Sequence, residues 1–223
     1  MDMSRSSLLQ ARQIEFRKCI LGEEQEFAAD IDMAFSPVHE PLVPVLQVSG
    51  AGVGISAQGK CTIAMPQSEE GDALRLQKTL RCACTNLIRG IAANIVGDTH
   101  AWLDKRQQSR EDDGVAPVIT CVHVQHAKDD KSEELLAYLH ISVGAAVVLH
   151  DMQLVLHNGE HELLLPRMKG GGEIKVCTAA TAQALVDRSV TAYEATRKHK
   201  VDTPWSVAFD DGGNIKNIEK YSI

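Results

Sequence analysis

The chain has 223 residues, 44% of them hydrophobic and 24% charged, a balance typical of a soluble globular protein rather than a disordered one. Its formal net charge of -7 excludes a general attraction to polyanions such as DNA or acidic membranes, so any nucleic-acid contact must be local. Its apolar stretches are far shorter than the ~18 residues needed to span a bilayer, so we expect no membrane partner.

The export and redox signals point to a cytoplasmic protein. The N-terminal residues lack the apolar core and the cleavage site of a signal peptide. Six cysteines occur without a CxxC pair, and most of them sit inside apolar runs. We therefore expect reduced, mostly buried thiols and a cytoplasmic location.

The first half of the chain predicts an antiparallel meander followed by a helix. Hydrophobic and polar residues alternate in residues 26–35, the pattern of a half-buried strand, and a polar break separates them from a similar segment at 12–20. These two segments predict a hairpin. After Pro66, apolar residues from Leu80 to Ile95 recur at helical spacing and predict one amphipathic helix. Further strands are predicted at 43–48, 52–56 and 60–65.

The second half repeats this order after a polar linker at 97–116. Several strands are predicted before Pro166, and a helix is predicted at 179–200. The last residues, 201–223, fit neither unit. Two interpretations stay open for them: a hairpin-like tail folded against the second unit, or a partly disordered segment. The predicted strands are 118–124, 135–142, 146–149, 152–157 and 162–165.

A short echo in the sequence indicates that the two halves are copies of one unit. The stretch "GKCTIAMPQSEEG", residues 59–71, aligns without a gap with "GEHELLLPRMKGG", residues 159–171. Two unrelated units of the same class are the alternative, but whole repeated units are rarely accidental. The predicted division is an N-terminal extension at 1–11, a first repeat at 12–96, the linker at 97–116, a second repeat at 117–200 and the tail at 201–223.

The repeated segments resemble a known family. The second half carries "AVVLHDMQLVLHNGEHELLLPRMK", and the first half carries "IEFRKC", "EFAADIDMAF" and "TIAMPQS". Together they resemble the signature of the stage V sporulation protein G (SpoVG) septation-regulator family. The resemblance matches His150 and Asp151 to the family's His-Asp pair, Gly159 to its turn, and Pro66 and Pro166 to its strand-ending proline. Proline ends strand pairing because it has no N–H, so these positions are expected to be structural.

The resemblance implies a small cytoplasmic bacterial protein that binds DNA or RNA and influences septation, sporulation and gene expression. Family members form homodimers, so a tandem copy is expected to be an intramolecular version of that dimer. Arg167 and Lys169 lie where the family has a basic loop implicated in nucleic-acid contact. The first repeat departs from the pattern, since Gly50 and Ala51 replace the His-Asp pair and residues 67–70 form an acidic loop.

The predicted fold is α+β: two tandem small antiparallel β-meander sheets, each followed by one C-terminal α-helix, arranged as a pseudo-dimer. The predicted function is that of a non-enzymatic regulator that contacts DNA or RNA through the basic loop and helix of the second repeat. The alternative is a protein-interaction or self-assembly module of the same fold that lacks nucleic-acid binding, which the acidic net charge favours. The residues expected to contact nucleic acid are Arg167, Lys169, Lys175, Arg188, Arg197, Lys198 and Lys200.

Three other patterns suggest a cofactor or catalysis, each incompletely. Residues 54–61, "GISAQGKC", resemble a phosphate-binding P-loop, but a cysteine replaces the hydroxyl residue and a strand is predicted to follow instead of a helix. Six histidines between 123 and 161 accompany Cys121 without the spacing of a zinc motif. His150 and Asp151 are adjacent, so they point to opposite faces of a strand unless a bulge intervenes. We expect no catalytic site, no metal and no cofactor.

Overall fold

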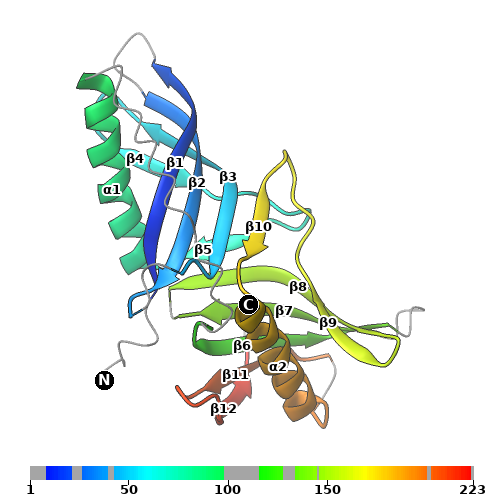
Figure 1. Ribbon diagram of the computed structural model, residues 1–223. Coiled ribbons are helices and arrows are strands. Elements are labelled where there is room, and N and C mark those ends of the chain that lie inside the picture. Colours follow the sequence, from blue (N-terminus) through cyan, green and yellow to red (C-terminus); the bar gives the residue numbers. More distant parts are fainter. Residues whose placement is uncertain are drawn as a thin grey trace.

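The computed structural model describes residues 9–21, 27–39, 43–97, 116–127, 134–144, 146–199 and 202–221. Within these ranges the chain forms two antiparallel sheets and two helices, and each sheet has one helix packed against it (Figure 1). The protein is therefore α+β, as predicted.

The first sheet is built mainly from the first half of the chain. Strands β1 (Leu9–Leu21), β2 (Phe27–Pro37), β3 (Leu46–Ile55) and β4 (Cys61–Ala64) pair in succession as antiparallel neighbours. The remaining member, β10 (Glu173–Val176), comes from the second half and also pairs with β3.

The second sheet is built mainly from the second half. Strands β6 (Ile119–His126), β7 (Leu135–Val143), β8 (Val147–His157) and β9 (Glu160–Leu164) pair in succession. On one side, β5 (Leu74–Leu76) from the first half pairs with β8. On the other side, the hairpin of β11 (Trp205–Phe209) and β12 (Ile215–Lys220) pairs with β6. The described part of the tail is thus a hairpin folded against the second unit, the first of the two predicted alternatives.

Each sheet takes one short strand from the other half of the chain. Leu74 of β5 lies opposite Leu149 of β8, and Ile174 of β10 lies opposite Val48 of β3. The sequence predicted a polar loop between each proline and its helix, and did not predict these strands. Three or four residues are too few to show an alternating pattern in the sequence. These segments become strands because they pair with the edge of the other half's sheet.

Two predicted pairs of strands are single strands with a bulge. The predicted segments 43–48 and 52–56 overlap one continuous strand, β3, which begins only at Leu46, ends at Ile55 and contains Gly50 with a φ of 76°. The segments 146–149 and 152–157 belong to β8, in which Asp151 has a φ of 56°. The residues that the sequence placed between two strands therefore lie inside one strand. A β-bulge accommodates a residue with positive φ, and the strand pairing continues on both sides of it.

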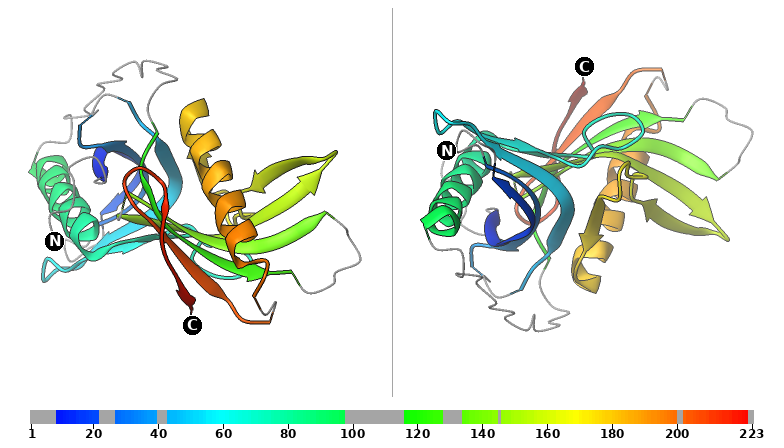
Figure 2. Two further views of the ribbon diagram at one scale, coloured as in Figure 1. Left: turned by 90° about the horizontal axis from the view of Figure 1, so that it is seen from below. Right: turned by 90° about the horizontal axis from the view of Figure 1, so that it is seen from above.

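The two helices differ in the face that they bury. Helix α1 (Lys78–Gly97) buries one apolar stripe at a spacing of four residues: Leu80, Cys84, Ile88 and Ala92. Helix α2 (Ala179–Thr196), capped by the Thr178 side chain, ends four residues before the predicted boundary. Its buried stripe mixes apolar and polar side chains: Thr181, Leu185, Ser189, Ala192 and Thr196. Seen from below and above, the two helices lie apart, each on its own sheet (Figure 2).

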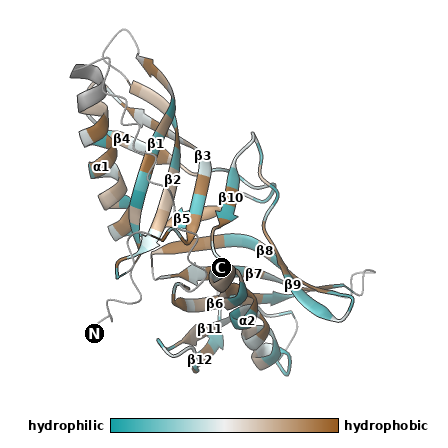
Figure 3. Cartoon of the chain, in the orientation of Figure 1, coloured by the Kyte–Doolittle hydropathy of each residue, from teal (hydrophilic) through white to brown (hydrophobic). Residues whose placement is uncertain are grey.

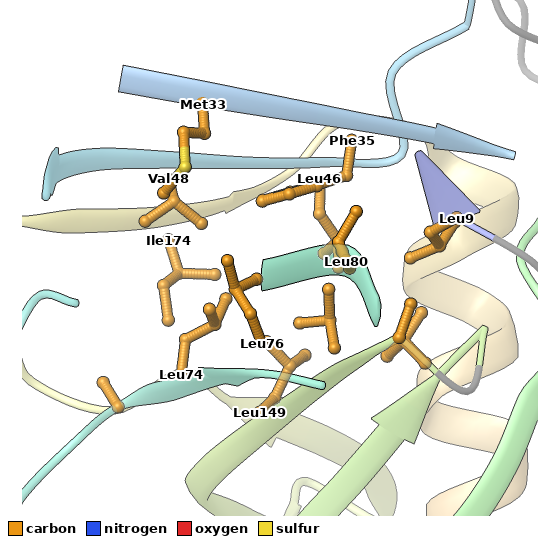
Figure 4. Close-up of a cluster of buried hydrophobic side chains, with 14 of the residues drawn as sticks. Leu9, Met33, Phe35, Leu46, Val48, Leu74, Leu76, Leu80, Leu149 and Ile174 are labelled. Atoms are coloured by element: carbon orange, nitrogen blue, oxygen red, sulfur yellow. The ribbon is translucent and has the colours of Figure 1, made fainter. Parts of the chain in front are cut away.

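The two sheets meet in a shared hydrophobic core. Figure 4 shows Leu74 and Leu76 of β5 among side chains of β2, β3, β8, β10 and α1. Leu46, Val48, Leu74 and Leu149 are fully buried there. Figure 3 shows β8 as hydrophobic where it meets β5, with a hydrophilic stretch next to that part. The exchanged strands therefore fuse the two halves into one core.

Candidate functional site

The loops that follow Pro66 and Pro166 cross each other between the two sheets. Ser68 and Met168 form an isolated antiparallel bridge at the crossing. The backbone N–H of Lys169 donates to the carbonyl oxygen of Gln67 at 2.7 Å, and its Nζ lies 3.2 Å from the carbonyl oxygen of Glu69. The acidic loop of the first half and the basic loop of the second half are therefore neighbours.

The side chain of Ser68 anchors this crossing to the second sheet. Its hydroxyl is buried and donates to Asp151 Oδ2 at 2.8 Å. Oγ of Ser68 also accepts hydrogen bonds from the backbone N–H groups of Glu70 and Gly71, both at 3.2 Å. One serine thus organises its own loop and holds it on β8.

The bulge residue beside it has a counterpart in the first sheet. The backbone N–H of Asp151 donates to Nδ1 of His140 at 3.3 Å, and the N–H of Gly50 donates to Oδ1 of Asp32, also at 3.3 Å. The structural counterpart of Asp151 is therefore Gly50, and Ser49 takes the place of His150. The sequence prediction that Gly50 and Ala51 replace the His-Asp pair was wrong by one residue, because the offset between the halves is 101 in these strands and 100 after the following turn.

A row of histidines crosses the face of the second sheet that points away from α2. His123 lies opposite His140 on neighbouring strands, and the rings of His140 and His150 are 4.9 Å apart. Tyr221 stacks on His123 at 4.0 Å. His126 identifies the opposite face of the sheet, because its side chain hydrogen-bonds to Thr196 of α2 at 3.0 Å. His123 is three residues away on the same strand, so its side chain points to the face without the helix.

Burial controls the charge of this row. It lowers the pKa of His123, His140 and His150, and mutual repulsion lowers the values at His123 and His150 further. The carboxylate of Asp151 opposes the shift at His140 and His150. The rings are therefore neutral at neutral pH and add no positive charge to the surface.

The histidine row does not have the geometry of the zinc site considered from the sequence. His140 Nδ1 accepts the N–H of Asp151, so its neutral ring carries the proton on Nε2 and has no free lone pair for a metal. Cys121 Sγ lies 3.3 Å from Ser206 Oγ and 3.9 Å from His123 Nε2. In the described ranges no group of three His, Cys, Asp or Glu side chains is placed to hold a metal ion.

The residues predicted to contact nucleic acid fall into two groups. Arg167 and Lys169 are exposed on the loop at the crossing, and Lys175 is exposed on β10 opposite Gln47. Arg197 and Lys198 follow α2, whose 18 residues extend ~27 Å at a rise of ~1.5 Å per residue. The structure brings the first three near the junction of the sheets and leaves the other two at the far end of the helix.

Besides Lys169, two of the predicted contact residues have partners within the chain, and one is not described. The guanidinium of Arg188 lies over the ring of Phe209 at 5.6 Å. Arg197 lies 3.6 Å from Glu194 Oε1. Lys200 lies outside the described residues. Sequence reasoning also missed Arg75, which is exposed on β5 at the place corresponding to Lys175 on β10. The shared offset of 100 residues was the signal that pointed to it.

The family-motif residues occupy turns and close contacts. Gly159, with a φ of 85°, forms a hairpin turn with Asn158, a combination that suits two-residue turns. Pro66 is buried against Gly172, where an added Cβ would lie only 2.8 Å from the proline Cβ. Pro166 is half-buried after β9. These positions shape the junction.

The P-loop-like segment is a hairpin turn. Residues 54–61 connect β3 to β4, and the N–H of Gly59 donates to the carbonyl oxygen of Ser56 at 2.7 Å. Strand β4 follows, so no helix N-terminus is present to hold a phosphate.

The cysteines correct another expectation. All six are free, but only Cys84 is buried, and Cys82 is exposed. Burial raises the pKa of Cys84 to about 11, so this thiol stays protonated and unreactive at neutral pH. The prediction of mostly buried thiols was wrong: Cys19 and Cys61 lie on strands β1 and β4 at the edges of the first sheet, and Cys82 lies on the exposed side of α1.

No family model, no curated protein and no solved structure matches the chain. Neither described helix is both long and apolar enough to cross a membrane. The geometry of the junction and of the two sheet faces is therefore the basis for a functional conclusion.

Proposed function

We propose that this protein is a non-enzymatic nucleic-acid-binding regulator, resembling the SpoVG septation regulators, built as a pseudo-dimer of two repeats. The observation that carries the binding proposal is the exposed pair Arg167 and Lys169 on the loop where the halves cross. Gly170 and Gly171 follow with positive φ and have open space around them, so a phosphate can approach the backbone closely.

The reciprocal strand exchange supports the pseudo-dimer. The pair Ile174 and Val48 maps onto the pair Leu74 and Leu149 by offsets of 100 and 101 residues, the offsets found elsewhere in the two sheets. Under a twofold relation, a residue pairs with its own counterpart only near the axis. Ser68 and Met168 differ by 100 and pair with each other, which supports a pseudo-twofold axis at their bridge.

Charge distinguishes the two loops at this axis. Arg167 and Lys169 follow Pro166, whereas Glu69 and Glu70 follow Pro66 at the corresponding place. Lys175 and Arg75 occupy corresponding positions on the exchanged strands, and both are exposed. We infer that the strand of nucleic acid runs along the basic loop toward Lys175, while the acidic loop serves the internal junction.

The test is binding of labelled mixed-sequence pools of single-stranded RNA, single-stranded DNA and duplex DNA at low and rising salt. Arg167→Ala combined with Lys169→Ala is expected to weaken binding and to reduce the slope of log K against log salt by ~1.5, since each phosphate contact contributes ~0.7–0.9. Lys60→Ala with Lys78→Ala removes the same charge at exposed sites of the first half and is the matched control.

The outcomes separate the two candidate functions. If the wild-type protein binds none of the pools at low salt, nucleic-acid binding is overturned. An equal loss in both double variants would mean that net charge, not the loop, governs binding. The protein-interaction or self-assembly alternative is favoured by one observation: Lys169 Nζ bonds to the Glu69 carbonyl, so part of the basic charge is already engaged within the molecule.

A further inference from the structure

Corresponding strands of the two sheets, β6 and β1, differ in whether a strand pairs with their outer edge. Strand β6 has β7 on one side and β11 on the other, with Trp205–Ala208 lying antiparallel to Cys121–Val124. Its counterpart β1 pairs with β2, and among the described strands none pairs with its second edge. Among the described residues, the tail hairpin therefore closes one unit, and no strand pairs with the corresponding edge of the other unit.

Strands β1 and β6 correspond from Ala11 to Phe16 and from Ile119 to Val124, and β1 alone then has a second register shift at Phe16/Lys18. Ile14 pairs with Met33 as Val122 pairs with Ile141, and both hairpins have a register shift three residues earlier, at Ala11/Gln13 and Ile119/Cys121. Val122 is fully buried, whereas Ile14 stays partly exposed. The missing neighbour strand explains this difference.

Helix α1 does not account for the open edge. It packs against β1 as α2 packs against β6, and β6 nevertheless pairs with β11. A further strand therefore fits beside β1 without displacing the helix.

The edge that β12 forms in the second sheet is shorter than the edge that β1 forms in the first. Strand β12 has six residues, most of them exposed, and carries Lys216 and Lys220. Short edges with lysine are a common protection against edge-to-edge pairing. Strand β1 has thirteen residues and exposes Ile20 to 60%. A long edge strand with exposed apolar side chains is a template for another strand.

We propose that β1 pairs antiparallel with β1 of a second copy of this chain, which joins the two first sheets into one. The charges on the exposed face fit this occupant. With Phe16 on the twofold axis, Glu15 of each copy faces Arg17 of the other, and two cross-strand ion pairs can form. Arg17 is the extra residue of a bulge in the pairing of β1 with β2, so the bulges of the two copies lie beside the axis. Glu15 is exposed and the Arg17 side chain is 61% exposed, although it also contacts Asp32 within its own chain. The proposal does not depend on nucleic-acid binding.

Sedimentation equilibrium of the full chain between ~1 and 100 µM tests this pairing. The wild-type protein is expected to reach twice the mass of one chain. Glu15→Lys with Ile20→Lys places like charges across the axis and is expected to raise the dimer dissociation constant at least tenfold. Both side chains are exposed, so the fold is expected to survive. The matched control is Glu219→Lys with Ile215→Lys on β12, which is expected to leave the dimer intact.

Three results would overturn the proposal: a wild-type monomer throughout this range, a dimer that the β1 variant leaves intact, or a dimer that only the β12 variant disrupts. Hydrogen exchange of the wild-type protein gives an answer that needs no variant. Backbone amides of β1 are expected to exchange more slowly as concentration rises, while those of β12 keep their rate. An unchanged rate in β1 at dimer concentrations would also refute the pairing.

Discussion

The hydroxyl of Ser68 donates a hydrogen bond of 2.8 Å to the carboxylate of Asp151, 83 residues farther along the chain. This bond joins the crossing loop of the first half to the bulge of the second sheet. On the other side of the junction, Gly50, the counterpart of Asp151, packs against the backbone of Gly172, where an added Cβ at Gly50 would lie 2.9 Å from the Gly172 Cα. The junction is thus held by a polar contact on one side and by close glycine packing on the other.

We expect Ser68→Ala to lower the free energy of unfolding by about 1–3 kcal/mol, since it leaves Asp151 without this donor. Asp151→Gly introduces the residue that the first half has at this place and suits a positive φ. A double-mutant cycle between the two changes is expected to give a coupling energy of about 0.5–3 kcal/mol, measured by urea denaturation. Strict additivity would mean that the contact contributes nothing.

Gly172→Ala is expected to destabilise the protein by about 1–3 kcal/mol, because the new methyl group meets buried Pro66 at 2.8 Å and the Ser49 carbonyl oxygen at 3.4 Å. The control is Gly90→Ala on the exposed side of α1, where a Cβ meets nothing within 4 Å. That change is expected to stabilise the helix by about 0.5–1 kcal/mol. Thermal unfolding of both variants gives the comparison, and a stabilising Gly172→Ala would contradict the close contact.

Stability is expected to fall as the pH drops below about 6.5, the ordinary pKa of histidine. Burial lowers the pKa of His123, His126, His140 and His150 in the folded protein, so the unfolded chain binds protons first as the solution is acidified. The stabilisation is complete above pH 6.5 and is lost as the pH falls through the lowered values. Denaturation midpoints between pH 7.5 and 5 measure this loss.

His140→Gln tests the origin of that pH dependence, since glutamine can still accept the N–H of Asp151 but does not titrate. The variant is expected to lose less stability on acidification than the wild type does. His157→Gln removes an imidazole whose side chain is 52% exposed and serves as the control. The same acid sensitivity in all three proteins would exclude the histidine row as its source.

The strand exchange predicts that neither half folds alone. A chain of residues 116–223 lacks β5, and a chain of residues 1–97 lacks β10, so each would expose the shared core around Leu74, Leu149 and Ile174. Separate halves are expected to show no cooperative unfolding, and mixing them is expected to restore it, as followed by circular dichroism. Cooperative unfolding of residues 116–223 alone would show that the exchange is dispensable. Leu74→Ala in the full chain is expected to cost about 2–5 kcal/mol.

Local patterns in the sequence predict much of the fold because alternation and helical spacing act over a few residues. The alternation at 26–35 lies in β2, and the spacing from Leu80 lies in α1. The buried face of α2 was harder to predict, since Thr181, Ser189 and Thr196 look like solvent-facing residues. The hydroxyl of Thr196 can be buried because His126, from a strand distant in the sequence, forms a hydrogen bond with it.

The sequence alone also indicated the duplication, since Pro66 and Pro166 stand in segments that align without a gap. It did not show that β5 and β10 change sheets, that Asp151 corresponds to Gly50, or that Ser68 reaches Asp151. Those relationships involve residues about 70 to 130 positions apart, and they form only when the two sheets bury one core together. The chain therefore encodes its elements locally, whereas the junction, the histidine row and the open edge of β1 depend on packing across the whole molecule.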